Sequence, residues 1–213
     1  MPKSDFSKVK LLIIDLDNTL CDTFHTLSLH QWEKAARALE KDGRVRQADA
    51  LRGEFGKASF VFSLEQLKMP MEERRIAIKA YDAVRVKTLT LFPDAKAIMS
   101  HPLPKVLVTR GERKLQDEKV AHLKLQKYFK EIYLVPTFKS KKDAFKAILK
   151  RHNLKPGEAL VIGDRVEEEI KDANQLRMPS CLVRRPMWPT HKGVAKPTIT
   201  VRSLRAIAKL LPR

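Results

Sequence analysis

Two acidic residues, Asp15 and Asp17, follow a run of four apolar residues, Leu11–Ile14. A short continuous apolar run predicts a strand that is buried on both faces, as in a parallel sheet. At the end of such a strand, two residues separated by one position can leave the sheet on the same side. Two carboxylates this close repel each other unless a cation lies between them or one is protonated. Ligands that are all oxygen suit a hard ion such as Mg²⁺.

The same two acids could instead belong to a surface turn and cap the following element. The rest of the chain argues against this alternative, because polar residues also end other apolar runs. Thr109 ends the run that begins at Lys105, and Asp164 follows the run 159–163. In parallel sheets, ligands bind beyond the carboxyl ends of the strands. Independent turns would have no reason to place their polar residues at this one edge.

Apolar patterns along the chain alternate between strands and helices. The predicted strands are 9–14, 105–109, 132–135, 159–163, 181–183 and a last short one at 198–201. Alternation of this kind predicts right-handed crossovers and a parallel sheet covered on both sides. Residues 23–87 show helical spacing and no strand pattern. The prediction is an α/β fold with a Rossmann-like parallel sheet, formed by 1–21 and 89–213, and an inserted helical subdomain at 22–88.

Four motifs in this order resemble those of the haloacid dehalogenase (HAD) superfamily, over nearly the whole chain outside residues 22–90. The run Asp15-Leu16-Asp17-Asn18-Thr19-Leu20 is similar to the first motif, Val108–Gly111 to the second, and Val161–Ile170 to the fourth. The third motif places a lysine before a helix, as the segment 138–145 does. The resemblance implies the HAD fold, with an insertion similar to a helical C1-type cap.

The resemblance implies different catalytic roles for the two acids of the first motif. Asp15 would be the nucleophile that takes a phosphoryl group as an aspartyl-phosphate. Asp17 would protonate the leaving oxygen and then activate the water that hydrolyses the intermediate. Dehalogenases of this superfamily generally lack the second acid, because a halide needs no proton. Asp17 therefore favours phosphoryl transfer.

The resemblance also implies a metal site. Asp15, the carbonyl of Asp17 and Asp164 would hold Mg²⁺, which neutralises charge and orients the phosphate. The fourth motif usually has a second Asp, where this chain has Glu168 and Glu169. Glu169 is in the better register and could support the metal through a bound water. Alternatively, Glu169 is an ordinary exposed acid in the first turn of a helix.

The expected phosphate ligands are Thr109, Arg110 and a lysine of the third motif. Lys139 has the spacing to Phe145 that many family members show, and it is the predicted lysine. Lys142 is closer to the start of the helix and is the alternative. A solvated basic run would account for whichever lysine is not used.

Composition limits the classes of protein to be considered. The chain has 213 residues, of which 43% are hydrophobic and 32% charged, as expected of a globular protein with a sizeable core. No apolar run approaches membrane-spanning length, and Met1–Asp5 is not a signal peptide. Cys21 and Cys181 do not form a disulfide framework. A reduced, cytoplasmic protein without a membrane partner is expected.

The net charge of +18 is unusual, and residues 180–213 contain no acid. Such a surface attracts polyanions, including nucleic acid and phosphorylated substrates. The alternative is a generally basic surface without a specific partner. A cap that closes over the site would obstruct a polymer and favours a small phosphorylated substrate.

The expected function is that of a Mg²⁺-dependent phosphomonoester hydrolase. Two alternatives remain open from the sequence. One is a phosphatase for nucleotides or nucleic-acid ends, and the other is a nucleic-acid-binding protein on a HAD fold that has lost catalysis.

Overall fold

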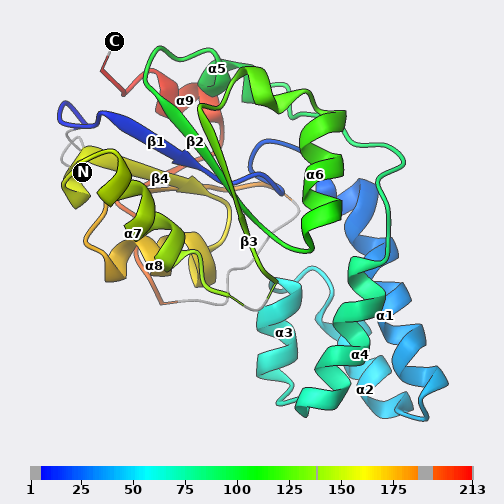
Figure 1. Ribbon diagram of the computed structural model, residues 1–213. Helices are drawn as coiled ribbons and strands as arrows, with labels where there is room; N and C mark the ends of the chain where they lie inside the picture. The colour runs from blue at the N-terminus through cyan, green and yellow to red at the C-terminus, as the bar shows by residue number, and fades with distance from the viewer. Residues whose placement is uncertain (1–5, 138, 187–193, 213) are drawn as a thin grey trace.

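A parallel β-sheet forms the centre of the computed structural model, which describes residues 6–137, 139–186 and 194–212 (Figure 1). Within these residues the sheet has six strands in the order β3-β2-β1-β4-β5-β6, and all neighbours are parallel. The strands are β1 (Leu11–Ile14), β2 (Lys105–Arg110), β3 (Glu131–Val135), β4 (Ala159–Gly163), β5 (Ser180–Val183) and β6 (Ile199–Val201). The predicted α/β fold is confirmed.

The central strand β1 divides its side chains between two hydrophobic layers. Leu12 and Ile14 pack into one layer, and Leu11 and Ile13 pack into the other. This division follows from the alternation of side chains along a strand, and burial on both faces requires the continuous apolar run. Because β2 and β4 flank β1, the residues that follow these three strands lie next to one another at the carboxyl edge of the sheet.

Helices cover both faces of the sheet (Figure 1). One face carries α5 (Ala95–Met99), α6 (Arg113–His122) and α9 (Leu204–Ala208), and the other carries α7 (Lys142–Arg151) and α8 (Lys171–Gln175). Short helical turns lie at Phe24–Ser28, Leu125–Lys127, Pro156–Glu158 and Val166–Ile170, and the first and last of these are π-helical. None of the helices formed by the described residues has the length and apolar character needed to span a membrane.

The segment between β1 and β2 forms a separate group of helices, which we call the helical cap. It consists of α1 (Leu29–Lys41), α2 (Val45–Glu54), α3 (Phe60–Gln66) and α4 (Met71–Asp82). These helices pack around their own hydrophobic cluster. In it the ring of Phe60 lies edge-on to Trp32 and stacks on Tyr81, with ring centres 5.2 and 4.0 Å apart, respectively. The predicted domain boundaries at residues 21/22 and 88/89 stay a prediction.

A buried arginine, Arg185, lies in the segment after β5 and connects the loop after β1 to Asp94, which precedes α5. Its Nε donates to the carbonyl of Asn18 at 3.3 Å, and its Nη2 donates to the carbonyl of Thr19 at 2.6 Å. The same guanidinium pairs with both carboxylate oxygens of Asp94, at 3.0 and 3.1 Å. It also lies 3.9 Å from the centre of the Phe92 ring. One side chain therefore fixes two consecutive carbonyls of the loop that follows Asp15.

Replacement of Arg185 should destabilise the protein strongly. Arg185→Met leaves the buried Asp94 carboxylate without its cation, so we expect the free energy of unfolding to fall by about 3–5 kcal/mol. Arg184 is exposed, and Arg184→Met is the matched control, with an expected change within about 0.5 kcal/mol. Urea unfolding followed by circular dichroism measures both variants. If the free energy of unfolding fell by the same small amount in both variants, the role assigned to Arg185 would be contradicted.

Candidate active site

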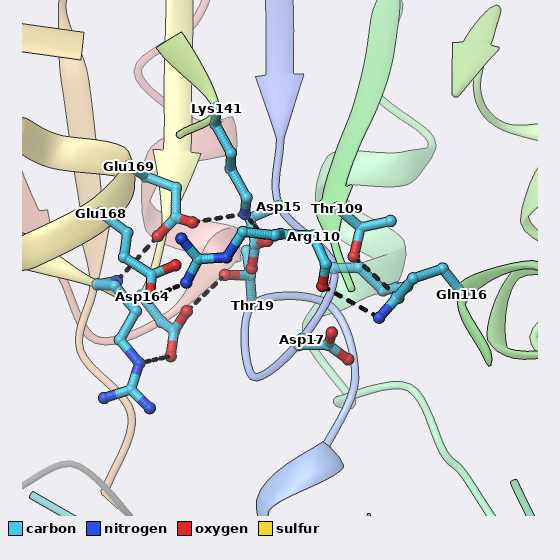
Figure 2. A network of polar contacts seen from close by, with 12 residues as sticks. Asp15, Asp17, Thr19, Thr109, Arg110, Gln116, Lys141, Asp164, Glu168 and Glu169 are labelled. Carbon is cyan, nitrogen blue, oxygen red and sulfur yellow. Dashed lines mark hydrogen bonds and ion pairs between the residues drawn. The ribbon is translucent and has the colours of Figure 1, made fainter. Parts of the chain in front are cut away.

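The loop after β1 brings Asp15 into a network of buried charges at the carboxyl edge of the sheet (Figure 2). The Nζ of Lys141 lies 2.5 Å from Oδ1 of Asp15 and 2.5 Å from Oε1 of Glu169. Burial raises the pKa of Asp15, and the ammonium of Lys141 opposes that shift. Burial alone would lower the pKa of Lys141, but the carboxylates of Asp15 and Glu169 raise it above its ordinary value. A protonated lysine is therefore held between two acids.

The prediction that Lys139 is the lysine of this site is wrong. Lys139 is exposed, and the alternative, Lys142, donates to the side-chain oxygen of Gln175 at 3.0 Å. Helix geometry explains why Lys141 is used. The amide of Phe145 donates to the carbonyl of Lys141 at 3.0 Å, so the two residues are one helical turn apart and share a face. Because Phe145 packs into the hydrophobic core, that face turns Lys141 inward.

Glu169 packs directly against Gly163, the last residue of β4. This close approach is possible because glycine has no side chain. A Cβ at Gly163 would lie 2.6 Å from Cγ of Glu169, so any other residue there would displace the acid. The second carboxylate oxygen of Glu169 accepts the amide of Arg165 at 3.2 Å. Burial raises the pKa of Glu169 to about 8, although Lys141 opposes the shift. Glu169 is buried, which excludes the alternative of an exposed acid, and its predicted support of the metal stays a prediction.

Arg110, at the end of β2, forms an ion pair with Glu168. Burial works against ionisation of Glu168, but the charges of Arg110 and Lys141 lower its pKa to about 2. The hydroxyl of Thr109 is fully buried and donates to Oε1 of Gln116 at 3.0 Å. The side-chain nitrogen Nε2 of Gln116 in turn donates to the carbonyl of Arg110 at 3.1 Å. Gln116, which the sequence analysis missed, therefore fixes the end of β2, and the phosphate-binding roles of Thr109 and Arg110 stay predictions.

A second buried lysine, Lys119 on α6, contacts Asp17. Its Nζ lies 2.8 and 2.9 Å from the two carboxylate oxygens of Asp17, and the lysine is 3% exposed. The apolar residues of this helix alone do not identify Lys119 as a site residue. The available signal was position: Lys119 is four residues after Leu115 and next to Val120, so it falls on the buried face.

Asp164, after β4, has a buried carboxylate oxygen without a hydrogen bond. Its Oδ1 accepts from the hydroxyl of Thr19 at 3.4 Å, whereas Oδ2 has no hydrogen-bond partner and only lies 3.6 Å from Nε of Arg165. Burial raises the pKa of Asp164 well above its ordinary value; Arg165 opposes this shift, and Asp15 adds to it. A cation near this oxygen would relieve both the burial and the repulsion.

These residues fit Mg²⁺, which commonly takes one or two carboxylates and completes its shell with other oxygens. Asp15 and Asp164 would supply the carboxylates. Across the residues that the structure describes, no three His, Cys, Asp or Glu side chains are grouped as metal ligands. The remaining donors would be backbone carbonyls and water, and the carboxylate of Asp17 is instead paired with Lys119.

A cavity of about 110 Å³ lies between the helical cap and the core, directly over these charges. The core contributes Asp15, Asp17, Arg110, Gln116, Lys119, Lys141, Asp164, Glu168 and Glu169. The cap contributes Ser28, Gln31, Trp32, Ser59, Phe60, Val61, Tyr81 and Asp82. The predicted residues Asp15, Asp17, Arg110, Asp164 and Glu169 are thus brought to one cavity, while Lys139 is exposed in the loop before α7.

Polar contacts connect the cap to the core around this cavity. The amide of Ser59 donates to Glu167 at 3.4 Å, the hydroxyl of Thr137 donates to Asp82 at 3.2 Å, and Arg85 lies 3.5 Å from Glu112 and 3.6 Å from Glu118. These contacts are few and polar, whereas the cap has a hydrophobic cluster of its own. The cap therefore covers the cavity without sharing a core with the sheet.

Comparison with known proteins agrees with this geometry. The model of the haloacid dehalogenase-like hydrolase family matches residues 9–175. The chain belongs to this family. This hydrolase is 25% identical to rat (Rattus norvegicus) N-acylneuraminate-9-phosphatase over 193 residues, 78% of either chain. It is also 25% identical to glyceraldehyde 3-phosphate phosphatase of Pyrococcus furiosus over 191 residues, 80% of this chain and 79% of that one.

The fold of the hydrolase is similar to that of a haloacid dehalogenase-like hydrolase family protein from Streptococcus pneumoniae. The TM-score is 0.70 with 18% sequence identity, and the match covers 95% of this chain and 98% of that chain. At this identity the similarity concerns the fold. The residues described above determine the chemistry.

The stability of the hydrolase should depend on pH through the ionisation of Asp82. Burial raises the pKa of Asp82 to about 6, although the hydroxyl of Thr137 opposes the shift. The folded state therefore binds this proton more tightly than the unfolded state, and stability is lost as pH rises from about 4 to about 6. Asp82→Asn removes that loss. Because the side chain is partly exposed and screened by solvent, we expect a stabilisation of about 1–2 kcal/mol at pH 7 and much less at pH 4.

Urea unfolding at pH 4 and pH 7 tests this expectation. Asp143 is exposed on α7, and Asp143→Asn is the control that removes one acid without removing a buried carboxylate. If Asp82→Asn raised the free energy of unfolding equally at both pH values, the raised pKa assigned to Asp82 would be contradicted.

Proposed function

We propose that the protein is a Mg²⁺-dependent phosphomonoester hydrolase that acts on a small phosphorylated metabolite through an aspartyl-phosphate at Asp15. The observation that carries the proposal is the convergence of Asp15, Asp17, Lys141 and Asp164 on one cavity beneath the helical cap. Isolated turns or capping acids would not share a cavity with two buried lysines. The two curated relatives are both named phosphatases, which supports the same reaction class.

In the first half of the reaction, the carboxylate of Asp15 attacks phosphorus, and the bond between phosphorus and the ester oxygen breaks. Asp17 donates a proton to that oxygen as it leaves. In the second half, Asp17 takes a proton from the water that attacks phosphorus. The bond between phosphorus and Asp15 then breaks, which releases inorganic phosphate and restores the free carboxylate of Asp15.

Lys141 provides the fixed positive charge of this reaction. It is hydrogen-bonded to Asp15 at 2.5 Å and is held by Glu169, so its ammonium is in place before the substrate arrives. Preorganised charge of this kind stabilises negative charge that develops in the transition state. Asp15 and Asp164 would hold Mg²⁺, whose charge offsets the repulsion between the phosphate and the acids.

Asp17 favours hydrolysis of a phosphate ester over removal of a halide. An alkoxide leaving group needs a proton, whereas a halide does not. Lys119 holds the carboxylate of Asp17 at the cavity by contacts to both of its oxygens. The place of Asp17 in the lining of the cavity supports a role as acid and base, which a dehalogenase would not require.

The size of the cavity favours a small substrate. Its volume is about 110 Å³, and contacts such as that of Asp82 with Thr137 connect the cap to the core at its rim. A nucleic-acid end would have to displace these contacts. The net charge of +18 remains the one observation that favours a nucleotide or nucleic-acid substrate. The complete set of charged residues in the cavity argues against a binding protein that has lost catalysis.

Removal of the nucleophile should abolish turnover. Asp15→Asn is expected to lower phosphate release from p-nitrophenyl phosphate in the presence of Mg²⁺ by at least about 10³-fold. Chelation of divalent ions should abolish the activity of the wild type in the same assay. Circular dichroism of the variant controls for its folding. Full activity in the presence of chelator would contradict the metal dependence, and full activity of Asp15→Asn would contradict the aspartyl-phosphate.

The two lysines that flank Ser140 should behave very differently. Lys141→Met removes the ammonium beside Asp15, and kcat should fall by at least about 10²-fold. Lys139→Met changes an exposed residue and should leave kcat close to that of the wild type. Lys141→Arg, which keeps the charge, tests whether a loss reflects charge or folding. A comparable loss of kcat in Lys139→Met would overturn the assignment of Lys141.

A further inference from the structure

Most of the net positive charge of the chain belongs to the core and not to the helical cap. In the cap, basic and acidic residues nearly balance, and ion pairs join many of them, such as Arg52 with Glu33 and Glu40. In the core, by contrast, several acids are buried at the active site, as Asp15 and Glu169 are. The exposed surface of the core therefore carries an excess of positive charge.

A row of lysines lies along the side of α7 that faces α8. Lys142, Lys146 and Lys150 follow one another at intervals of four residues, so they share one side of the helix. Each interval advances by about 6 Å along the helix axis, and the row spans about 12 Å. Nζ of Lys142 donates to Oε1 of Gln175 on α8 at 3.0 Å, which places this side of α7 next to α8.

The neighbouring helix α8 extends the positive charge beyond α7. The two helices lie side by side on one face of the sheet (Figure 1), and the hydroxyl of Ser140, before α7, donates to the buried Asp172 of α8 at 2.7 Å. Lys171 is exposed on α8, and Arg177 is exposed just after it. The α7–α8 basic face, as we call it, consists of Lys142, Lys146, Lys150, Lys171 and Arg177.

Most charges of the α7–α8 basic face have no acidic partner. Asp143 is the exposed acid of α7, and it lies 3.8 Å from Nζ of Lys146. Lys150, Lys171 and Arg177 form no ion pair in the part of the chain that the structure describes. Repulsion among unpaired like charges is relieved when a polyanion binds, and the counterions that leave the polyanion add to the affinity.

The uncharged residues of the same helices indicate which polyanion fits. Helices that bind membrane surfaces insert large apolar side chains, and proteins that bind single-stranded nucleic acid stack bases on aromatic side chains. Neither kind is exposed on α7 or α8, where the exposed uncharged residues are small or polar, such as Ala147 and Asn174. A duplex needs neither, because its dense row of phosphates can be bound by basic side chains alone.

We propose that the α7–α8 basic face binds the phosphate backbone of double-stranded nucleic acid, independently of base sequence. None of its five residues lines the active-site cavity, so the nucleic acid is a partner of the protein and not its substrate. The inference therefore goes beyond the proposed phosphatase function and does not depend on it. It also accounts for the excess of basic residues, which the reaction itself does not require.

Fluorescence anisotropy with labelled DNA duplexes of about 20 base pairs tests the proposal. Two duplexes of unrelated sequence should give the same Kd. Each phosphate contact contributes a slope of about 0.9 to the dependence of log Kd on log salt concentration, so five contacts predict a slope of about 4–5. The measurement uses the full chain between about 50 and 200 mM salt, where this dependence is steep.

Two double variants with the same change in net charge locate the contact. Lys146→Gln combined with Lys150→Gln should weaken binding at about 50 mM salt by at least about tenfold and lower the slope by about 2. Lys34→Gln combined with Lys79→Gln removes two exposed lysines of the cap and should leave the slope unchanged. Both variants should release phosphate from p-nitrophenyl phosphate at the rate of the wild type, which also confirms that they are folded.

Several results would overturn the inference. One is equal weakening in the two double variants, because net charge alone would then attract the duplex. Another is the absence of duplex binding at about 50 mM salt, where contacts to phosphate are strong. Tighter binding to vesicles that contain phosphatidylserine would assign the face to a membrane surface instead. Tighter binding to single-stranded DNA of the same length would exclude the duplex as the preferred partner.

Discussion

The buried ammonium of Lys141 is the interaction on which the rest of the site depends. Asp15 and Glu169 are both almost completely removed from water, where an unpaired carboxylate is strongly destabilising. One lysine compensates two acids only in part, and Asp164 adds a buried oxygen without a hydrogen bond. Burial and the charge of Asp15 both disfavour a second charge on Asp164, which is the electrostatic basis of the proposed Mg²⁺ site. The same positive charge that allows the acids to be buried is available to the phosphoryl group during transfer.

Much of this arrangement could be predicted because it follows from the sheet. The apolar run of β1 requires burial on both faces, and that requirement places β1 between β2 and β4. Residues at the ends of these strands then meet without any further assumption. Asp15, Asp17, Thr109 and Asp164 could therefore be placed at this edge from periodicity and order along the chain. The backbone of a strand fixes the position of the residue that follows it, so little depends on side-chain conformation.

The lysines could not be predicted in the same way, because their positions depend on helix phase and on long side chains. Lys139, Lys141 and Lys142 are nearly equivalent in the sequence, and only the packing of Phe145 decides which of them turns inward. Lys119 is similar: its helix also carries exposed charges, and its burial follows from the neighbouring Leu115 and Val120. A lysine spans several rotatable bonds, so the partner it reaches is set by tertiary packing rather than by spacing along the chain.

Arg185 supports the loop after β1 from outside the part of the chain that matches the family model. The match to the family model ends at residue 175, ten positions before this arginine. Yet Arg185 holds the carbonyls of Asn18 and Thr19, which directly follow the acids of the first motif. A protein trimmed to the family boundaries would keep every predicted catalytic residue and lose the support of the loop that carries them. The support of the loop after β1 therefore extends beyond the residues that match the family model, to the segment that follows β5.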